Sequence, residues 1–239
     1  MNKGVLYVAS NKTFYLEEAV FSAKSFKKYN KNIPITIYTN LKEADNYKVF
    51  DQVIFDYEDL HPFLYKTKAL NSFPYQKTLF VDSDTMFKGS VYELFPLLDN
   101  FDLAIAKRIH ADWNPPIKFI KYEDPFQFNT GVFSYNDSQN TRDFFKKWLE
   151  EVIRENELHN YYHLTGDQVC FNHLLIHNEM DKHCNMKIVT IPNRIYNARH
   201  MFGELKKDNL LNEVKIWHQH GLNKSIFNKI KDKLFYKFK

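Results

Sequence analysis

The segment KTLFVDSDTMF, residues 77–87, joins a short apolar run to two carboxylates that are one residue apart. Residues 78–81 have the pattern of a buried strand, and Asp82 and Asp84 follow directly where this strand ends. Two neighbouring carboxylates repel each other and lose favourable hydration when they are buried. The pair therefore predicts either a solvated turn or a site that holds a cation.

The segments on either side alternate between strand and helix patterns. From Thr13 to Tyr29, apolar residues recur at the spacing of an amphipathic helix. The runs GVLYVAS and IPITIYTN are almost wholly apolar, as buried strands are. In the first half we expect strands at residues 4–10, 33–40, 51–57, 78–81 and 102–106, and helices at residues 13–29, 66–73 and 91–98.

The second half of the chain is less regular. Gly131 interrupts the strand pattern NTGVFSYN, which indicates a close approach of other groups to the backbone. Here we expect strands at residues 129–136, 186–192 and 213–217, and helices at residues 141–157 and 166–177.

Strands that alternate with helices predict an α/β fold, a Rossmann-like mixed sheet with helices on both faces. In such sheets ligands bind beyond the carboxyl ends of the strands, which is where Asp82 and Asp84 are expected. The length of 239 residues and the lack of repeats or linkers favour a single domain over residues 1–222. Its nucleotide-binding half would span residues 1–106, and residues 107–222 would complete the cleft and bind the acceptor.

Composition excludes some partners and indicates a compartment. The formal net charge of +4 is too small to indicate a nucleic-acid partner. Cys170 and Cys184 lack the spacing of a metal site and suit free thiols in a reducing compartment. The N-terminus lacks the apolar region of a signal peptide, and no run is long enough for a transmembrane helix. We therefore expect a cytoplasmic protein.

The last residues, 223–239, differ from the rest because they are rich in lysine with apolar residues about four apart. This pattern is typical of a basic amphipathic tail. Residues 225–239 would contact the inner, anionic face of a membrane peripherally, or the tail would pack on the domain with a solvated lysine face.

An Asp-X-Asp triplet alone is common in turns, but the end of a buried strand favours a ligand site. Carboxylates are hard ligands for Mg²⁺ or Mn²⁺, and such an ion could neutralise a diphosphate leaving group. Near the other end of the chain, Gly221 follows His218 by three residues and Lys224 follows Gly221 by three. An imidazole ligand shifts the preference towards Mn²⁺, while glycine and lysine suit contacts with phosphate oxygens.

The motifs VDSDT, FNTGVF, TGDQ and HQHGLNK occur in this order along the chain. Together with the first strand and helix, VLYVASNKTFYLEEAVFSAKSF, they resemble the retaining glycosyltransferases of family 8. That family includes glycogenin and bacterial polysaccharide galactosyl- and glucosyltransferases. The resemblance runs from Val5 to about Lys224 and implies the A-type glycosyltransferase fold of nucleotide-diphospho-sugar transferases.

The resemblance implies a role for each matching residue. Asp82, Asp84 and His218 match the metal ligands, and Gly221 and Lys224 match the residues that hold the diphosphate. Two departures bear on these roles: the family's Lys-Pro-Trp is replaced by Lys-Ser-Ile at residues 224–226, and a second histidine, His220, competes for the ligand role.

Further residues match donor and catalytic positions. The implied donor contacts are Lys66 (or its rival Lys68), Ser83 between the aspartates, Ala9, Ser10 and Asn11 around the base and ribose, and Tyr15 or Phe14 stacked on the base. The implied catalytic residues are Asn129 near the donor sugar and Asp167 and Gln168 beside the anomeric carbon.

These residues predict a Mn²⁺- or Mg²⁺-dependent glycosyltransferase that moves a hexose from a nucleotide-diphosphate sugar, most simply a UDP-sugar, with retention. The acceptor would be a glycan or a lipid-linked saccharide, with Trp113 or Tyr196 stacking on it. An inverting enzyme with Asp167 as base, and a non-catalytic nucleotide-sugar binder, stay open as alternatives. A nucleotidyltransferase is disfavoured because the loop after the first strand, ASNKTFYLEE, has no glycine.

Overall fold

The computed structural model describes residues 2–108, 127–159, 166–176 and 183–222. Its main sheet has seven strands, and two further strands form a small separate sheet. The main strands are β1 (Lys3–Ala9), β2 (Ile35–Thr39), β3 (Gln52–Phe55), β4 (Lys77–Val81), β6 (Leu103–Lys107), β7 (Phe128–Asn136) and β8 (Ile188–Ile191). The small sheet pairs β5 (Thr85–Phe87) with β9 (Ile216–His218).

The main sheet has the strand order β3-β2-β1-β4-β7-β6-β8 and is mixed, as the sequence predicts. Strands β3, β2, β1 and β4 run parallel, whereas β7 is antiparallel to both β4 and β6. An antiparallel neighbour begins where β4 ends, so the first residues of β7 lie beside the aspartates. The Asp82 amide donates to the Gly131 carbonyl oxygen at 2.7 Å, which extends the β4–β7 pairing to this point.

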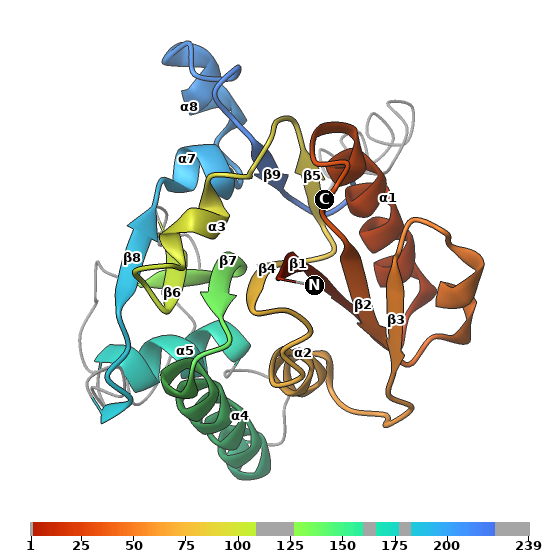
Figure 1. Ribbon diagram of the computed structural model, residues 1–239, viewed down its shortest axis with the longest axis vertical. Coiled ribbons are helices and arrows are strands. Elements are labelled where there is room, and N and C mark those ends of the chain that lie inside the picture. Colours follow the sequence, from red (N-terminus) through yellow and green to blue (C-terminus); the bar gives the residue numbers. More distant parts are fainter. Residues whose placement is uncertain (1, 109–126, 160–165, 177–182, 223–239) are drawn as a thin grey trace, which may run out of the picture.

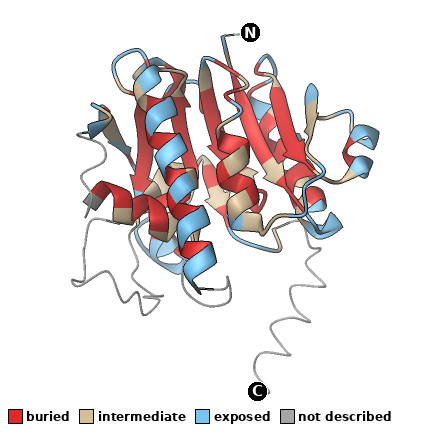
Figure 2. Ribbon diagram, turned by 90° about the horizontal axis from the view of Figure 1, so that it is seen from below, coloured by how far each residue is buried: buried red, intermediate tan, exposed pale blue. Residues whose placement is uncertain are grey.

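Helices cover both faces of this sheet. The helices are α1 (Thr13–Tyr29), α2 (Pro62–Leu70), α3 (Leu94–Leu97), α4 (Gln139–His159), α5 (Asp167–Ile176), α7 (Asn193–Tyr196) and α8 (Phe202–Lys207), with a 3₁₀ helix η1 (Lys42–Asn46). In Figure 2 the longer helices have buried residues on the side that faces the sheet and exposed residues on the side that faces solvent.

Two apolar cores separate the layers, because alternate strand residues point to opposite faces. Val5 and Tyr7 of β1 belong to the core under α1 and α3. Leu6 of the same strand belongs to the core under α2, α4 and α5, where Trp148 is completely buried. This period-2 pattern of nearly continuous apolar residues is what a strand with helices on both faces requires.

Most predicted elements are present, and α1 has the predicted bounds. Helix α2 begins at Pro62 instead of Lys66, because proline suits the first helical turn and the His61 side chain accepts from the Phe63 amide. It ends at Leu70 instead of at residue 73, because Asn71 turns back and donates to the Thr67 carbonyl oxygen at 2.9 Å. The helix expected at residues 91–98 is only the four-residue α3.

The small sheet explains how the two ends of the chain meet. In its register Thr85 of β5 lies opposite His218 of β9, and the two strands run side by side in Figure 1. Helix α1 holds β5 in place, since Ser25 accepts from the Phe87 amide at 2.8 Å and the Ser22 and Thr85 hydroxyls are 2.6 Å apart. Strand β5 itself was not predicted.

The main sheet contains strands from both sides of the predicted division at residues 106 and 107. The division therefore stays a prediction. The predicted tail, residues 223–239, and the candidate acceptor contact Trp113 lie outside the described residues. In the described part of the chain no helix is long and apolar enough to cross a membrane.

Candidate metal centre

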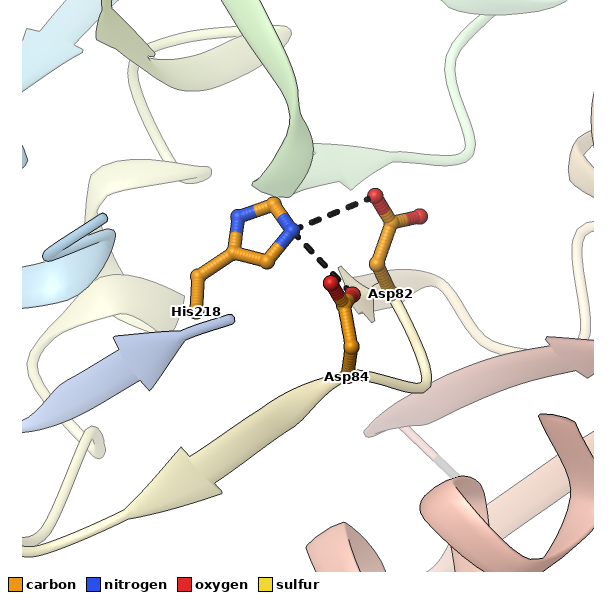
Figure 3. A group of neighbouring side chains, drawn as sticks. All are labelled: Asp82, Asp84 and His218. Carbon is orange, nitrogen blue, oxygen red and sulfur yellow. Dashed lines mark ion pairs between the residues drawn. The ribbon is translucent and has the colours of Figure 1, made fainter. Parts of the chain in front are cut away.

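Asp82, Asp84 and His218 come together at the carboxyl end of β4, as the sequence predicts (Figure 3). Nε2 of His218 lies 3.2 Å from Oδ1 of Asp84 and 3.6 Å from Oδ2 of Asp82. One ligand atom from each residue falls within 4.8 Å of the others. Two carboxylates and an imidazole at this separation are a suitable donor set for a divalent cation such as Mn²⁺.

Backbone pairing fixes these three residues relative to one another. Asp82 directly follows β4, and its carbonyl oxygen accepts from the Thr85 hydroxyl at 2.9 Å, which tightens the turn that carries Asp84. On the other side, the Gln219 amide donates to the Asp84 carbonyl oxygen at 2.8 Å. The position of His218 beside the aspartates is therefore fixed by the backbone pairing of β5 with β9.

Gly131 of β7 leaves the space that His218 occupies. A Cβ at this position would lie 2.1 Å from Cε1 of His218 and 2.8 Å from Oδ2 of Asp82. The close approach predicted for this glycine is therefore confirmed, and the approaching group is the imidazole of His218.

Burial and charge differ between the two aspartates. Asp84 is 5% exposed; burial alone would raise its pKa, but His218 and His220 outweigh burial and hold the pKa well below its usual range. For Asp82, burial and the neighbouring carboxylates raise the pKa despite the nearby Lys66 and His218. The Asp82 side chain is 30% exposed, so the cluster is open to solvent on its side.

Lys66 links the cluster to Asp167. Its ammonium group lies 3.0 Å from Asp82 Oδ1 and 2.9 Å from Asp167 Oδ2, and it donates to the Thr130 carbonyl oxygen at 3.0 Å. Burial alone would lower the pKa of Lys66, but the two carboxylates outweigh burial and raise it. The rival residue, Lys68, pairs instead with Asp56 and Glu58.

Asp167 and Gln168 lie at the start of α5 and face β7. Asp167 Oδ2 accepts from the Thr130 hydroxyl at 2.7 Å, and Gln168 Oε1 accepts from the Thr130 amide at 3.3 Å. The indole of Trp148 donates to the Asp167 carbonyl oxygen at 2.8 Å. This predicted pair is therefore connected to the candidate metal centre through Thr130 and Lys66, and Thr130 itself was not predicted.

His220 and Gly221 lie at the edge of the cluster. Nδ1 of His220 is 3.4 Å from Asp84 Oδ2 and 3.3 Å from a carboxylate oxygen of Glu18, and the residue is mostly exposed. The Gly221 amide donates to the other Glu18 oxygen at 3.0 Å, and Gly221 has a φ of 76°, which favours glycine. The buried Glu18 was not predicted, because a carboxylate on the inner side of α1 breaks the apolar pattern.

Polar groups of the loop after β1 make hydrogen bonds to other residues of the protein. Ala9 and Ser10 are buried, and Asn11 has a φ of 65°. Asn11 donates through its side chain to the Leu60 carbonyl oxygen at 2.9 Å and accepts from Asn40 at 2.6 Å. The roles of these three residues towards a base and ribose stay predictions.

The remaining predicted residues are placed as follows. Tyr15 is half-buried against the core, whereas Phe14 is 38% exposed with its ring 6.5 Å from that of His220. Ser83 is buried between the two aspartates. Tyr196 is partly buried, donates to Glu93 at 2.8 Å and packs against the core, and its stacking on an acceptor stays a prediction. Lys224 lies outside the described residues.

No protein-family model matches the sequence, and no curated protein matches it closely enough to indicate a relative. The fold is similar to that of the glycosyltransferase GlyE of Streptococcus pneumoniae TIGR4, with a TM-score of 0.57 at 16% sequence identity. The similarity covers 99% of this chain and 64% of the GlyE chain, so this chain spans less than two thirds of its neighbour. At this identity the similarity concerns the fold: the mixed sheet with helices on both faces is one that a glycosyltransferase has.

Proposed function

We propose that this protein is a metal-dependent glycosyltransferase that moves a hexose from a nucleotide-diphosphate sugar, with a UDP-sugar favoured, to a hydroxyl group of a glycan or lipid-linked saccharide. The observation that carries the proposal is the convergence of Asp82, Asp84 and His218 at the carboxyl end of β4. This is where open α/β sheets bind their ligands. The fold that the chain shares with a glycosyltransferase supports the same reading.

Each part of the site has a task in such a reaction. A divalent cation held by Asp82, Asp84 and His218 would neutralise the diphosphate and stabilise it as a leaving group. Lys66, with its raised pKa, stays charged and places a buried ammonium group between Asp82 and Asp167. The bond between the anomeric carbon and the phosphate oxygen breaks, the acceptor oxygen bonds to the same carbon, and the acceptor proton passes to a base.

Retention is favoured over inversion by the surroundings of Asp167. An inverting enzyme needs a carboxylate that is available to take the acceptor proton. Here Asp167 Oδ2 already faces the Lys66 ammonium at 2.9 Å and accepts from Thr130 at 2.7 Å. Under retention the leaving phosphate can serve as the base instead. NMR of the product's anomeric configuration distinguishes the two mechanisms directly.

The proposal is tested by Asp84→Asn. We expect this variant to lose transfer and Mn²⁺-dependent UDP binding, because one of the two carboxylates no longer carries charge. The metal-free variant should stay folded, since an amide has nearly the same shape as the carboxylate that it replaces. The matched control is Asp45→Asn, which removes the same charge from an exposed position in η1.

A thermal-shift screen of nucleotide sugars with and without Mn²⁺ would identify the donor, because a ligand that binds the native state raises its melting temperature. Normal transfer by Asp84→Asn would show that the site is wrongly assigned. Peripheral membrane contact through residues 225–239 is a separate proposal. It predicts that truncation before Ser225 reduces binding to anionic vesicles and leaves UDP affinity unchanged.

A further inference from the structure

Three buried side chains form a hydrogen-bonded chain behind the metal centre. The Gly131 amide donates to Oδ1 of Asn129 at 2.9 Å. Nδ2 of Asn197 donates to the same oxygen at 2.8 Å, and Oδ1 of Asn197 lies 2.7 Å from Nδ1 of His218. Asn197 is completely buried and His218 is 1% exposed.

We call Asn129, Asn197 and His218 the asparagine chain. The donor and the acceptor of each of its hydrogen bonds can be assigned in turn, starting from the Gly131 amide. A backbone amide can only donate, so the atom of Asn129 that faces Gly131 must be the oxygen. The group of Asn197 that meets this oxygen must then be its NH₂, which turns the Asn197 oxygen towards His218. An oxygen can only accept, so Nδ1 of His218 carries the proton.

A neutral imidazole with its proton on Nδ1 has a lone pair on Nε2. That lone pair faces carboxylate oxygens of Asp84 at 3.2 Å and Asp82 at 3.6 Å. Acceptors that face one another repel unless a proton or a metal ion lies between them. We propose that Asn197 is the positioning residue that holds His218 in the Nδ1–H tautomer and so reserves Nε2 for a divalent cation; this inference rests on the proposed metal site.

The backbone makes this arrangement stiff. The Ala198 amide donates to the Ile216 carbonyl oxygen and the His218 amide donates to the Ala198 carbonyl oxygen, both at 3.0 Å. The side chains of Asn197 and His218 therefore keep their relative position without help from the cation. The same chain occupies Oδ1 of Asn129, which leaves only its Nδ2 group to contact a sugar.

Without Asn197, nothing in the asparagine chain would prevent the proton from moving to Nε2, where Asp84 could accept it. The cation would then have to displace that proton. Partners that orient a metal-ligand histidine typically change metal affinity 10- to 100-fold when they are removed.

The first test is ¹⁵N NMR of the His218 ring in metal-free protein, at a pH where the ring is neutral. The wild type should show the Nδ1–H tautomer, Asn197→Leu should show Nε2–H, and Asn197→Asp should restore Nδ1–H because a carboxylate still accepts. A wild-type ring in the Nε2–H tautomer would overturn the inference, and this result requires no variant to fold and no metal to bind.

The second test is Mn²⁺ affinity by titration calorimetry. As a single substitution, Asn197→Leu should weaken Mn²⁺ binding 10- to 100-fold relative to the wild type. Added to His218→Ala, the same substitution should have no further effect on Mn²⁺ affinity. An equal loss in both backgrounds would show a general structural role and overturn the inference. The control is Asn193→Leu in α7, which removes a bond to the Lys107 carbonyl oxygen and should leave Mn²⁺ affinity unchanged. A wild type that binds no Mn²⁺ would refute the proposed metal site itself.

Discussion

Gly131→Ala is a direct test of the candidate metal centre, because the atoms that an added Cβ would meet at this position are known. The added methyl group would lie 2.1 Å from Cε1 of His218, whereas ordinary contacts begin at 3.4 Å, so one of the two must move by about 1.3 Å. The His218 ring is held by Asn197, and its backbone by the pairing with Thr85. A shift of this size must therefore break the bond to Asn197 or distort β7.

Two measurable losses should follow from Gly131→Ala. Overpacking typically costs about 1–3 kcal/mol, which in a domain of this size lowers the melting temperature by about 2–4 °C per kcal/mol. Moving His218 away from Asp84 should weaken Mn²⁺ binding by about tenfold or more, because one of three protein ligands is misplaced. Thermal unfolding of metal-free protein and titration calorimetry measure the two effects separately.

The matched control is Gly203→Ala in α8, where an added Cβ meets no heavy atom within 4 Å. Alanine is the better helix former by about 1 kcal/mol, so this variant should be as stable as the wild type or more so, with unchanged Mn²⁺ affinity. If Gly131→Ala binds Mn²⁺ as tightly as the wild type and melts at the same temperature, the close approach of His218 to β7 does not exist in solution.

Two further predictions concern buried charges. Lys66→Met leaves the buried Asp167 and the partly exposed Asp82 without their shared cation and should lower the free energy of unfolding in urea by about 3–5 kcal/mol. Lys68→Met, at a more exposed pair, should lower it by about 0–1 kcal/mol, and the reverse order would contradict the assignment of Lys66. Glu151 has a pKa below its usual 4.5, since His173 and Arg154 outweigh the effect of burial. Its stabilising contribution is therefore complete above pH 4.5 and is lost as the pH falls through the lower, folded-state pKa. Below pH 4.5, stability should fall more steeply in the wild type than in Glu151→Gln, and parallel curves would show that the carboxylate is not stabilised by folding.

How far the sequence predicts this fold depends on how local each signal is. Helix α1 has the predicted bounds because Leu16, Ala19, Val20, Ala23 and Phe26 are all buried on one side. The start of α2 was misplaced because Lys66, a buried lysine with two carboxylate partners, looks like an exposed residue of a first turn. Strand β5 has only three residues, too few for any period to appear.

The residues of the candidate site also fall into those that a local sequence signal indicates and those that depend on distant contacts. Asp82 and Asp84 were singled out because two carboxylates at the end of a buried strand are a local signal, whereas His218 was assigned as a candidate ligand through the resemblance to family 8 glycosyltransferases. Asn197, Glu18 and Thr130 were missed because each acts on a residue that is distant in the sequence, so nothing local identifies the partner. Their contribution depends on which strands pair, and pairing over such distances has no local signature.

The geometry of the metal centre is set by elements that contribute no ligand. The Thr85 hydroxyl donates to the Asp82 carbonyl oxygen, so it must accept from Ser22, and Ser22 in turn must accept from the Tyr7 hydroxyl at 2.9 Å. Each hydroxyl has one proton to donate, which fixes the direction of the whole series from β1 through α1 to the turn after β4. Because α1 holds β5, and β5 holds β9, the position of His218 depends on the first helix of the chain. The carboxylate pair at the end of β4 therefore meets its third candidate ligand only through packing that lies far from it in the sequence.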